Sequence, residues 1–241
     1  MISKKVISDI VSKYSLGNVI EKVKWVVEDE KLLINFINDS KVLLGYVEYR
    51  NDIGLKNGDY GIFNTSQLIK CLNILDGDIL MEASNDRRKL NIADTNYEIK
   101  FGLSKPEVLP KVPEIKDEDN FSVSFSVNDE FITRFVKSKD ALSDLEIFTV
   151  ETREGFTGEE LVFTIGTTIT NSIEFTVEAD IKESFSSIPF DSNLFKEILK
   201  ANKNYHSGEI RINKKGLIDA HFHCGEGLFT GYYLVRKQDN N

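Results

Sequence analysis

Four copies of one apolar pattern recur along the chain at a nearly constant spacing. The clearest copy is LFKEIL, residues 194–199, in which two apolar pairs flank a charged step. The other copies begin at Val6, Leu68 and Phe131, and successive copies start 62, 63 and 63 positions apart. Apolar residues at i, i+1, i+4 and i+5 fall on one side of a helix. Each copy therefore predicts an amphipathic helix of about three turns with one face to bury.

Residues that favour helix starts stand directly before each copy. Side chains of Ser, Thr, Asn and Asp cap a helix by accepting a hydrogen bond from a free backbone N–H. The candidate caps are Ser3, Asn64–Thr65, Asn128 and Asp191–Ser192. Gly17 and Gly77 follow the ends of the first two helices, as glycines at C-terminal caps do. We therefore expect helices close to residues 3–14, 65–75, 128–139 and 192–203.

Stretches with strand character separate the helices. Many alternate apolar and polar residues, as in EIRIN and IEFTVE, which indicates antiparallel sheets with one buried face. Three stretches follow each helix: Val19–Glu28, Lys31–Ile37 and Leu43–Tyr49; Asp78–Ala83, Lys89–Ala93 and Tyr97–Phe101; Leu145–Thr152, Leu161–Thr167 and Ser172–Glu178; Gly208–Ile212, Leu217–Phe222 and Leu228–Val235. Two more, Tyr60–Phe63 and Phe121–Val127, lead into later helices. The pattern predicts an α+β fold in which a unit of roughly 60 residues occurs four times.

A proline-containing segment divides these units into two pairs. Pro106, Pro110 and Pro113 lie within residues 104–120, which cannot sustain a helix or a central strand. We predict an N-terminal domain at residues 1–103, a connector at 104–120 and a C-terminal domain at 121–241. The two domains are expected to be similar, each a duplicated helix-plus-strands unit with its helices on one face of the sheets.

Composition excludes several classes of protein. The 41% of hydrophobic residues are enough to build a core in a chain of 241 residues. No apolar run approaches the roughly 18 residues that span a bilayer, and the N-terminus shows no signal-peptide pattern. We therefore expect no membrane partner and a cytoplasmic location. Cys71 and Cys224 are too few for a disulfide framework and are expected to be reduced thiols.

The charge of the chain is unevenly distributed. Its net charge is −9, yet the four predicted helices sum to +6, which leaves −15 for the remainder. Including Asp76, Asp140 and Asp191, just outside the predicted helices, lowers the helix sum to +3. Lysines on exposed helix faces, with no aromatic residues among them, suit a phosphate backbone contacted without sequence readout. Ordinary solvated helix faces are the competing interpretation. The candidate DNA contacts are Lys4, Lys5, Lys13, Lys70, Arg134, Lys137, Lys139, Lys196, Lys200 and Lys203.

One short cluster has metal-ligand character. In HFHC, residues 221–224, His221 and His223 would share one face of a strand, whereas Cys224 would point to the other. Two ligands make a poor site, and a pair of structural histidines on a half-exposed strand is the simpler interpretation. The sequence contains no glycine-rich phosphate loop, no G-x-S-x-G and no H-E-x-x-H. We expect no metal, no cofactor and no enzymatic activity.

The repeat, the connector and the helix charge together resemble the sliding DNA clamps, a family that includes proliferating cell nuclear antigen and the clamps of T-even-type phages. The resemblance covers essentially the whole chain. Its closest local matches are NTSQLIKCL with the following DGDILMEA, NYEIKFGL before the connector, and YYLVRK at 232–237. It implies a ring whose helices line a pore around duplex DNA, and the two-domain length resembles that of the trimeric clamps.

The resemblance also implies contacts with other proteins. These would be a DNA polymerase and an ATP-dependent clamp loader, with partner peptides held in a groove between the two halves and under the connector. Carried over by position, the groove residues are Ile37, Val42, Leu44, Leu109, Val112, Ile115 and Tyr233.

Unpaired edge strands support a ring independently of the resemblance. Edges at the two ends of such a repeat invite aggregation, whereas a closed head-to-tail interface removes every edge. NYEIKFG and SIEFTVE are the natural pair across subunits. The predicted interface residues are Tyr97, Ile99, Phe101, Ile173, Phe175 and Val177.

The sequence thus favours a homotrimeric processivity factor for DNA replication, located in the host cytoplasm if the source is a phage. It would encircle double-stranded DNA and tether a polymerase and other replication proteins. Two alternatives stay open. One is a clamp-like accessory protein that binds DNA as a monomer without sequence specificity. The other is an enzyme built around His221, His223 and an unidentified carboxylate.

Overall fold

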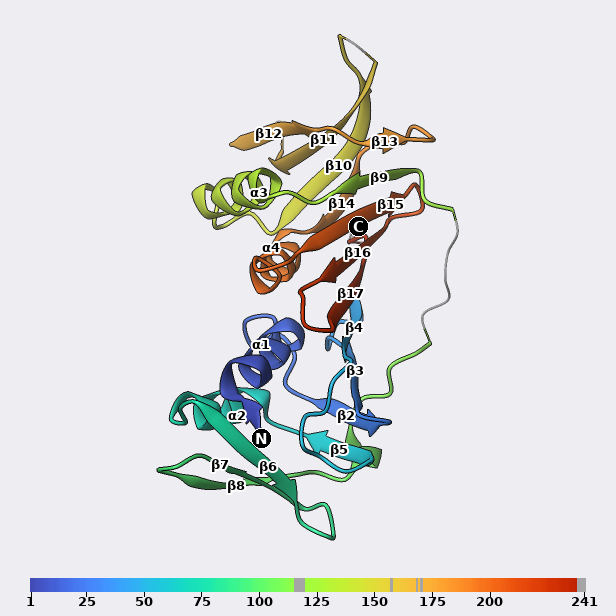
Figure 1. The fold of residues 1–241 in the computed structure, drawn as a ribbon. Coiled ribbons are helices and arrows are strands. Elements are labelled where there is room, and N and C mark those ends of the chain that lie inside the picture. Colours follow the sequence, from blue (N-terminus) through green and yellow to red (C-terminus); the bar gives the residue numbers. More distant parts are fainter. Residues whose placement is uncertain (115–119, 157, 168, 170, 238–241) are drawn as a thin grey trace. The chain divides into compact units, whose positions relative to one another are not determined.

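The described part of the chain contains four α-helices, one short 3-10 helix and 17 strands (Figure 1). The computed structural model describes residues 1–114, 120–156, 158–167, 169 and 171–237. The chain divides into two compact units. The first comprises residues 1–39, 44–113 and 225–230, and the second comprises residues 40–43, 114–224 and 231–241.

The elements follow one another in the order that the repeat predicts. Those before the connector are β1 Ile2–Ser3, α1 Lys4–Ser15, β2 Val23–Glu28, β3 Lys31–Ile37, β4 Leu43–Tyr49, β5 Gly58–Ile62, α2 Thr65–Asn73, β6 Asp78–Ala83, β7 Lys89–Ala93, β8 Glu98–Gly102 and the 3-10 helix Pro106–Val108. Those after it are β9 Val123–Ser126, α3 Asp129–Ala141, β10 Ile147–Glu154, β11 Glu159–Gly166, β12 Ser172–Val177, β13 Asp180–Ile181, β14 Ile188–Asp191, α4 Ser192–Ala201, β15 Ser207–Asn213, β16 Leu217–His223 and β17 Leu228–Val235.

All four helices begin at predicted caps. The side chains of Asn64 and Asn128 each accept a 2.8 Å hydrogen bond from the backbone N–H three residues later in the chain. Asp191 accepts two, from the backbone N–H groups of Asn193 and Leu194, and Ser3 accepts one from Lys5. These bonds satisfy donors that a helix leaves free at its start. The first helix ends at Leu16, which is left-handed with a φ of 46° and is followed by Gly17.

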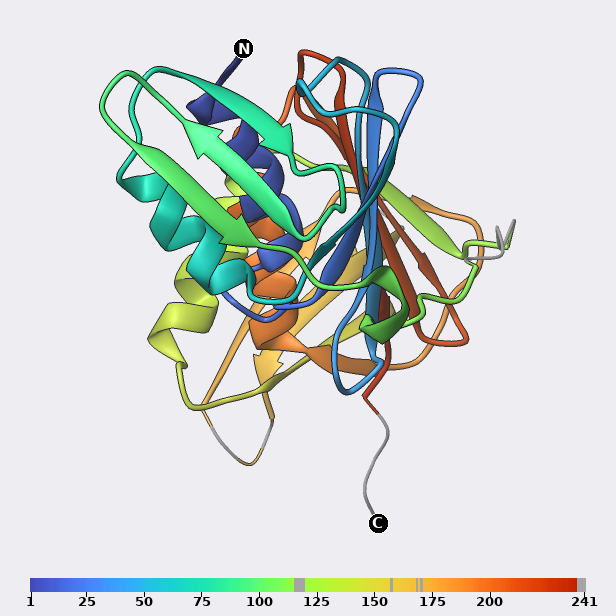
Figure 2. The ribbon, with the colours of Figure 1, turned by 90° about the horizontal axis from the view of Figure 1, so that it is seen from below.

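Two antiparallel sheets build the first unit. One has the order β1-β6-β7-β8, and the other contains the neighbours β4-β3-β2-β5. In β3, Leu32, Ile34 and Phe36 are buried while Leu33 is exposed, which is the period-two pattern of a sheet with one wet face. Helices α1 and α2 pack side by side (Figures 1 and 2).

The second unit repeats this plan. One sheet has the order β12-β11-β10-β14, and the other contains the neighbours β13-β9-β15-β16. Helices α3 and α4 pack side by side. Aromatic rings fill the core between helices and sheet: Phe135 lies 4.8 Å from Phe195 and 5.0 Å from Phe148, measured between ring centroids. Each fully buried ring of this kind contributes about 1.5–3 kcal/mol through removal of apolar surface from water.

The predicted α+β architecture is confirmed by these sheets and helices. Five strands have the predicted bounds at both ends, namely β3, β4, β6, β7 and β17. The strands β1, β13 and β14 were not predicted. The described helices include none that is long and apolar enough to pass through a membrane.

Candidate nucleic-acid interface and assembly edges

Four of the predicted DNA contacts offer an unneutralised charge to solvent. Lys5, Lys70, Lys137 and Lys203 are exposed, and none of them forms an ion pair or side-chain hydrogen bond with the described residues. Lys5, Lys70 and Lys137 lie in α1, α2 and α3, and Lys203 lies two residues after the end of α4. We refer to these four as the free helix lysines. Lys4, at the start of α1, is half-buried.

Three further cations of the helices are already paired. Arg134 binds Glu130 one turn earlier, and Lys200 lies 3.3 Å from Glu197. Lys196 of α4 binds Asp140 at the end of α3. The hydrogen bond from Lys196 holds the pKa of Asp140 below its ordinary value. These cations can reach a phosphate only in competition with a neighbouring carboxylate.

Two predicted DNA contacts have side chains that are buried in the structure. The Nζ atom of Lys13 lies 3.3 Å from Asp9, and none of the Lys13 side chain is exposed. Lys139 is 2% exposed, and its Nζ donates a 2.7 Å hydrogen bond to the backbone oxygen of Ser143. A cation near the end of a helix is stabilised by the carbonyl groups that the helix leaves free. Lys139 therefore has a structural role near the end of α3, where it binds a backbone carbonyl group.

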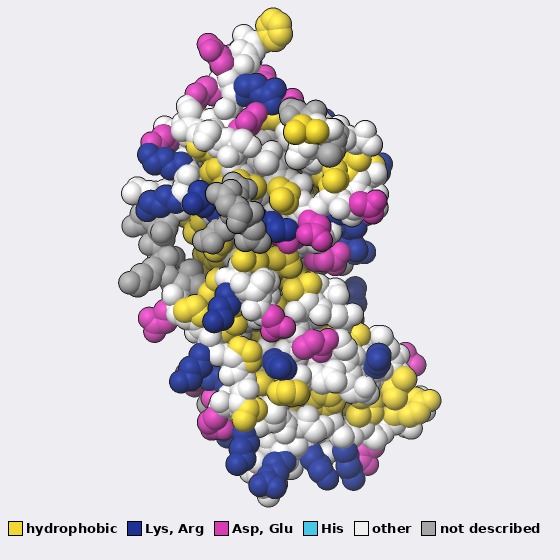
Figure 3. All heavy atoms as spheres, turned by 180° about the vertical axis from the view of Figure 1, so that it is seen from behind, with side chains coloured by type: hydrophobic (Ala, Val, Ile, Leu, Met, Phe, Trp, Pro, Cys, Tyr) yellow, Lys and Arg dark blue, Asp and Glu magenta, His cyan; other side chains and the backbone are white. Residues whose placement is uncertain are grey.

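The observed helix bounds also reduce the predicted charge. Helix α3 ends at Ala141 and therefore includes Asp140, which brings its net charge to zero. On the face drawn in Figure 3, basic and acidic side chains are interspersed. The case for phosphate contact therefore depends on the free helix lysines.

The predicted interface strands are both at the edge of a sheet. β8 ends the order β1-β6-β7-β8, and β12 ends the order β12-β11-β10-β14. Tyr97, directly before β8, is 52% exposed, whereas Phe101 is 7% exposed. The residues Ile99, Ile173, Phe175 and Val177 are half-buried. Among the described residues, each strand thus has one unpaired side and an apolar face that its own unit covers only in part.

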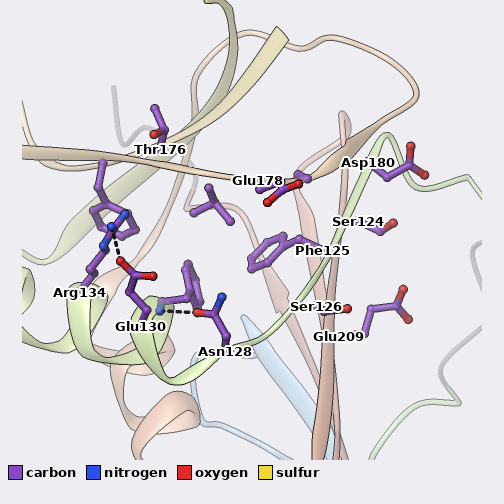
Figure 4. Close-up of a pocket in the computed structure, with 14 residues that line it drawn as sticks. Ser124, Phe125, Ser126, Asn128, Glu130, Arg134, Thr176, Glu178, Asp180 and Glu209 are labelled. Carbon is purple, nitrogen blue, oxygen red and sulfur yellow. Dashed lines mark hydrogen bonds and ion pairs between the residues drawn. The ribbon is translucent and has the colours of Figure 1, made fainter. Parts of the chain in front are cut away.

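A hollow of about 780 Å3 opens beside the end of β12 (Figure 4). Its lining includes the apolar residues Phe131, Phe175 and Val177, together with Glu130, Arg134, Glu178 and other polar groups. The sequence did not reveal this hollow, because its lining comes from α3, β9, β12, β15 and the segment after β12. The one sequence feature related to the hollow is the alternation in IEFTVE, which places Phe175 and Val177 on the same face of β12.

Residues of the predicted partner groove belong to both units. In the first, Ile37 and Leu44 lie opposite each other in the β3–β4 ladder and are half-buried. Leu109 is 7% exposed, and together with the half-buried Val112 it lines a second hollow of about 490 Å3.

This second hollow lies between the connector and the strands β2, β3 and β5, and the 3.1 Å ion pair of Lys24 with Asp59 is at its wall. In the second unit, Val42 and Tyr233 are half-buried. Ile115 lies outside the described residues.

His221 has a partner that the sequence did not suggest. Its Nε2 lies 2.5 Å from Oδ1 of Asp219, which is 1% exposed. The other oxygen of Asp219 accepts a 3.0 Å hydrogen bond from Nε of Arg211. His223 lies 6.0 Å from the ring of His206. Within the described ranges, no three His, Cys, Asp or Glu side chains gather closely enough to hold a metal ion.

Solved structures share this architecture over nearly their full length. Proliferating Cellular Nuclear Antigen from Entamoeba histolytica superposes with a TM-score of 0.73 over 98% of this chain and 96% of that one, at 16% identity. The chain has the fold of a sliding clamp. A. fulgidus PCNA, in a structure with the C-terminal region of FEN-1 bound, superposes with a TM-score of 0.78 over 100% of this chain and 98% of that one, at 13% identity. No protein-family model and no curated protein matches the sequence.

The clamp fold confirms the predicted resemblance at the level of architecture. Two similar domains, each with two helices and antiparallel sheets, account for the whole described chain. The sequence identities of 16% and 13% are too low to transfer residue roles. The positions of DNA contact, partner contact and subunit contact therefore stay predictions for this chain.

Proposed function

We propose that this protein is a non-enzymatic sliding clamp, a ring that encircles duplex DNA and tethers a DNA polymerase and other replication proteins. The observation that carries the proposal is the clamp fold over 98–100% of the chain. A fold shared over a whole chain does not by itself establish function. The proposal therefore also draws on the free helix lysines and on the two unpaired sheet edges.

The free helix lysines support contact with DNA that reads no sequence. Each lysine that contacts a phosphate releases a counterion, which makes such binding favourable at low salt and weak at high salt. Four weak contacts per chain suit a protein that slides. The acidic remainder of the chain would repel DNA from other surfaces.

The two edges support a closed homotrimer. β8 of one copy would pair with β12 of the next, and closure after three copies leaves neither of these two edges unpaired. DNA would then be held by topology, with affinity in a minor role. Because an intact ring cannot thread onto a circle, the proposal includes an ATP-dependent loader.

Partner binding rests on the comparison and on the second hollow. The A. fulgidus protein was solved with the C-terminal region of FEN-1 bound. For this chain we propose that polymerase and other replication proteins bind through short peptides with apolar anchors, using the predicted groove residues such as Leu44, Leu109 and Tyr233. The protein would act in the cytoplasm, or in the host cytoplasm for a phage source.

Retention on circular DNA tests the proposal. The protein is loaded onto nicked circular DNA with ATP and the clamp loader of the same organism. The DNA is then washed at high salt. A ring should stay bound, because release requires an open interface, while phosphate contacts alone weaken by orders of magnitude in salt. Cutting the circle once should release the protein from the ends.

Two outcomes would reject encirclement. One is equal retention on cut and uncut DNA, and the other is equal loss from both in a sample shown to be loaded before the wash. Native mass adds an independent check, since a trimer has about three times the 27.4 kDa mass of the chain. A monomer that binds DNA would favour the accessory-protein alternative.

A further inference from the structure

The unpaired side of β8 presents backbone groups from alternate residues. The β7–β8 ladder has hydrogen bonds from Asp94 N–H to Tyr97 O at 3.0 Å and from Leu103 N–H to Arg88 O at 2.8 Å. Hydrogen-bonded pairs alternate along an antiparallel ladder, so Ile99 and Phe101 also direct their backbone groups to β7. The N–H and C=O groups of Glu98, Lys100 and Gly102 therefore point away from β7.

The same argument applies to β12. Gly155 N–H donates to Gly158 O at 2.8 Å, which fixes the hydrogen-bonded positions of the β10–β11 ladder. By alternation, Leu161, Phe163 and Ile165 direct their backbone groups to their partners Val177, Phe175 and Ile173 in β12. Ser172, Glu174 and Thr176 therefore point their N–H and C=O groups away from β11.

Side chains follow the same division. On both strands, the residues with outward-pointing backbone carry exposed side chains, and most of these side chains are polar. The intervening residues, Tyr97, Ile99 and Phe101 in one strand and Ile173, Phe175 and Val177 in the other, lie on the core face. Two such edges can therefore pair so that their outward-pointing backbone groups form hydrogen bonds, while apolar residues lie opposite apolar residues and polar residues lie opposite polar ones.

Charge favours one alignment over the two neighbouring alignments that are also in phase. With Glu98 opposite Thr176, Lys100 lies opposite Glu174 in an antiparallel pair. A shift of two residues in either direction places Glu98 opposite Glu174 or Glu178. Like charges directly opposite each other destabilise a strand pair, whereas opposite charges stabilise it.

We propose that β8 of one copy pairs antiparallel with β12 of another in the alignment Glu98–Thr176, Lys100–Glu174 and Gly102–Ser172. The strand pairs β6–β7, β7–β8, β10–β11 and β11–β12 are all antiparallel, so the joined sheet continues the same pattern. The inference rests on the ring of the proposed function and specifies the contacts that close it. Lys100 then joins a line of alternating charge, since Glu98 lies 3.7 Å from it and Arg153 lies 2.8 Å from Glu174.

The hollow beside β12 supports this alignment. On the core face, Phe101 comes opposite Ile173, Ile99 opposite Phe175 and Tyr97 opposite Val177. Val177 and Phe175 line the hollow of about 780 Å3 (Figure 4), and Tyr97 is the most exposed of the three core-face residues of β8. The ring of Tyr97 from one copy would therefore enter the hollow of the next and contact the apolar residues of its lining.

Disulfide trapping tests the alignment. In a Cys71→Ser, Cys224→Ser background, Glu98→Cys is combined with Thr176→Cys. Opposed residues of a hydrogen-bonded pair have Cα atoms about 5.5 Å apart, within the range that a disulfide bridges. The same Glu98→Cys is combined with Glu174→Cys or Glu178→Cys as controls, which report the two shifted alignments.

We expect the first pair to form covalent dimers and trimers at least about ten times faster than either control, because diagonal neighbours lie roughly 7–8 Å apart. Linkage is measured on non-reducing gels, and native mass is measured in parallel. Faster linkage in a control pair would overturn the alignment alone, as would a trimer that forms no linkage in any pair. A chain that is monomeric at every concentration would overturn the proposed ring as well.

Discussion

The free helix lysines are exposed, and none of them forms an ion pair with a described side chain. Lys5, Lys70, Lys137 and Lys203 each belong to a different helix region, and each lies away from the apolar face of its helix. Their contribution to DNA binding should therefore be separable from folding. The paired cations Arg134, Lys196 and Lys200 should contribute less, since each must first leave a carboxylate.

Replacing the four free helix lysines with Ala should weaken binding to a short linear duplex and flatten its salt dependence. The slope of log K against log salt should fall by about 0.9 for each lysine that contacts a phosphate. Fluorescence anisotropy across a salt series measures this slope. The matched control replaces four exposed lysines outside the helices, Lys31, Lys56, Lys111 and Lys215, with Ala. Equal slopes in both variants would reject the helix lysines as the DNA contacts.

Asp140→Asn should have the opposite effect. This change removes the carboxylate that binds Lys196 and whose pKa is also lowered by Lys200 and Lys139. DNA affinity should rise by about two- to five-fold, the size of one surface charge interaction. Glu28→Gln changes the net charge equally at an exposed position away from the helices and serves as control. An equal gain from Glu28→Gln would attribute the effect to net charge alone.

At the scale of elements, the helix caps make a testable contribution to stability. Asp191 ends β14 and caps α4 with two hydrogen bonds, at 3.0 Å and 2.9 Å. Asp191→Ala should lower the free energy of unfolding in urea by about 1 kcal/mol, whereas Asp191→Asn keeps an acceptor and should cost less. Equal losses in both variants would show that the charge of Asp191, and not its cap, stabilises α4.

Local pattern predicted the elements that obey local rules. β3 was predicted at Lys31–Ile37 because Leu32, Ile34 and Phe36 alternate with residues that face water. β14 was missed because it is four residues long and contains Pro189, which removes a backbone donor. The sheet order places β14 at an edge, where a proline is tolerated.

Site residues were harder to predict, because their environment depends on distant parts of the chain. Asp140 neutralises Lys196 although 56 positions separate them. The periodicity of the sequence indicates which helix face is apolar, but it does not indicate that the side chains of Lys13 and Lys139 are buried. His221 was noticed for its neighbour His223, whereas its contact in the structure is Asp219.

At the scale of the whole molecule, the two sheet edges are different surfaces of one chain. A variant can therefore lose one edge and keep the other. Thr176→Pro should do so, because the N–H of Thr176 points away from β11 and its loss leaves the ladder within the unit intact. Thr176→Val keeps the backbone donor and is the matched control.

A chain that keeps the β8 edge but has lost the β12 edge would interfere with intact chains in the same cell. In the proposed ring, it would still join a neighbour through β8, take a place in the assembly and leave one interface that cannot close. In an equal mixture of the two chains, only about one-eighth of random trimers would contain three intact members. Retention on circular DNA should follow the cube of the intact fraction, and a linear decline would contradict a closed trimer. A single altered allele would then be dominant over an unaltered one.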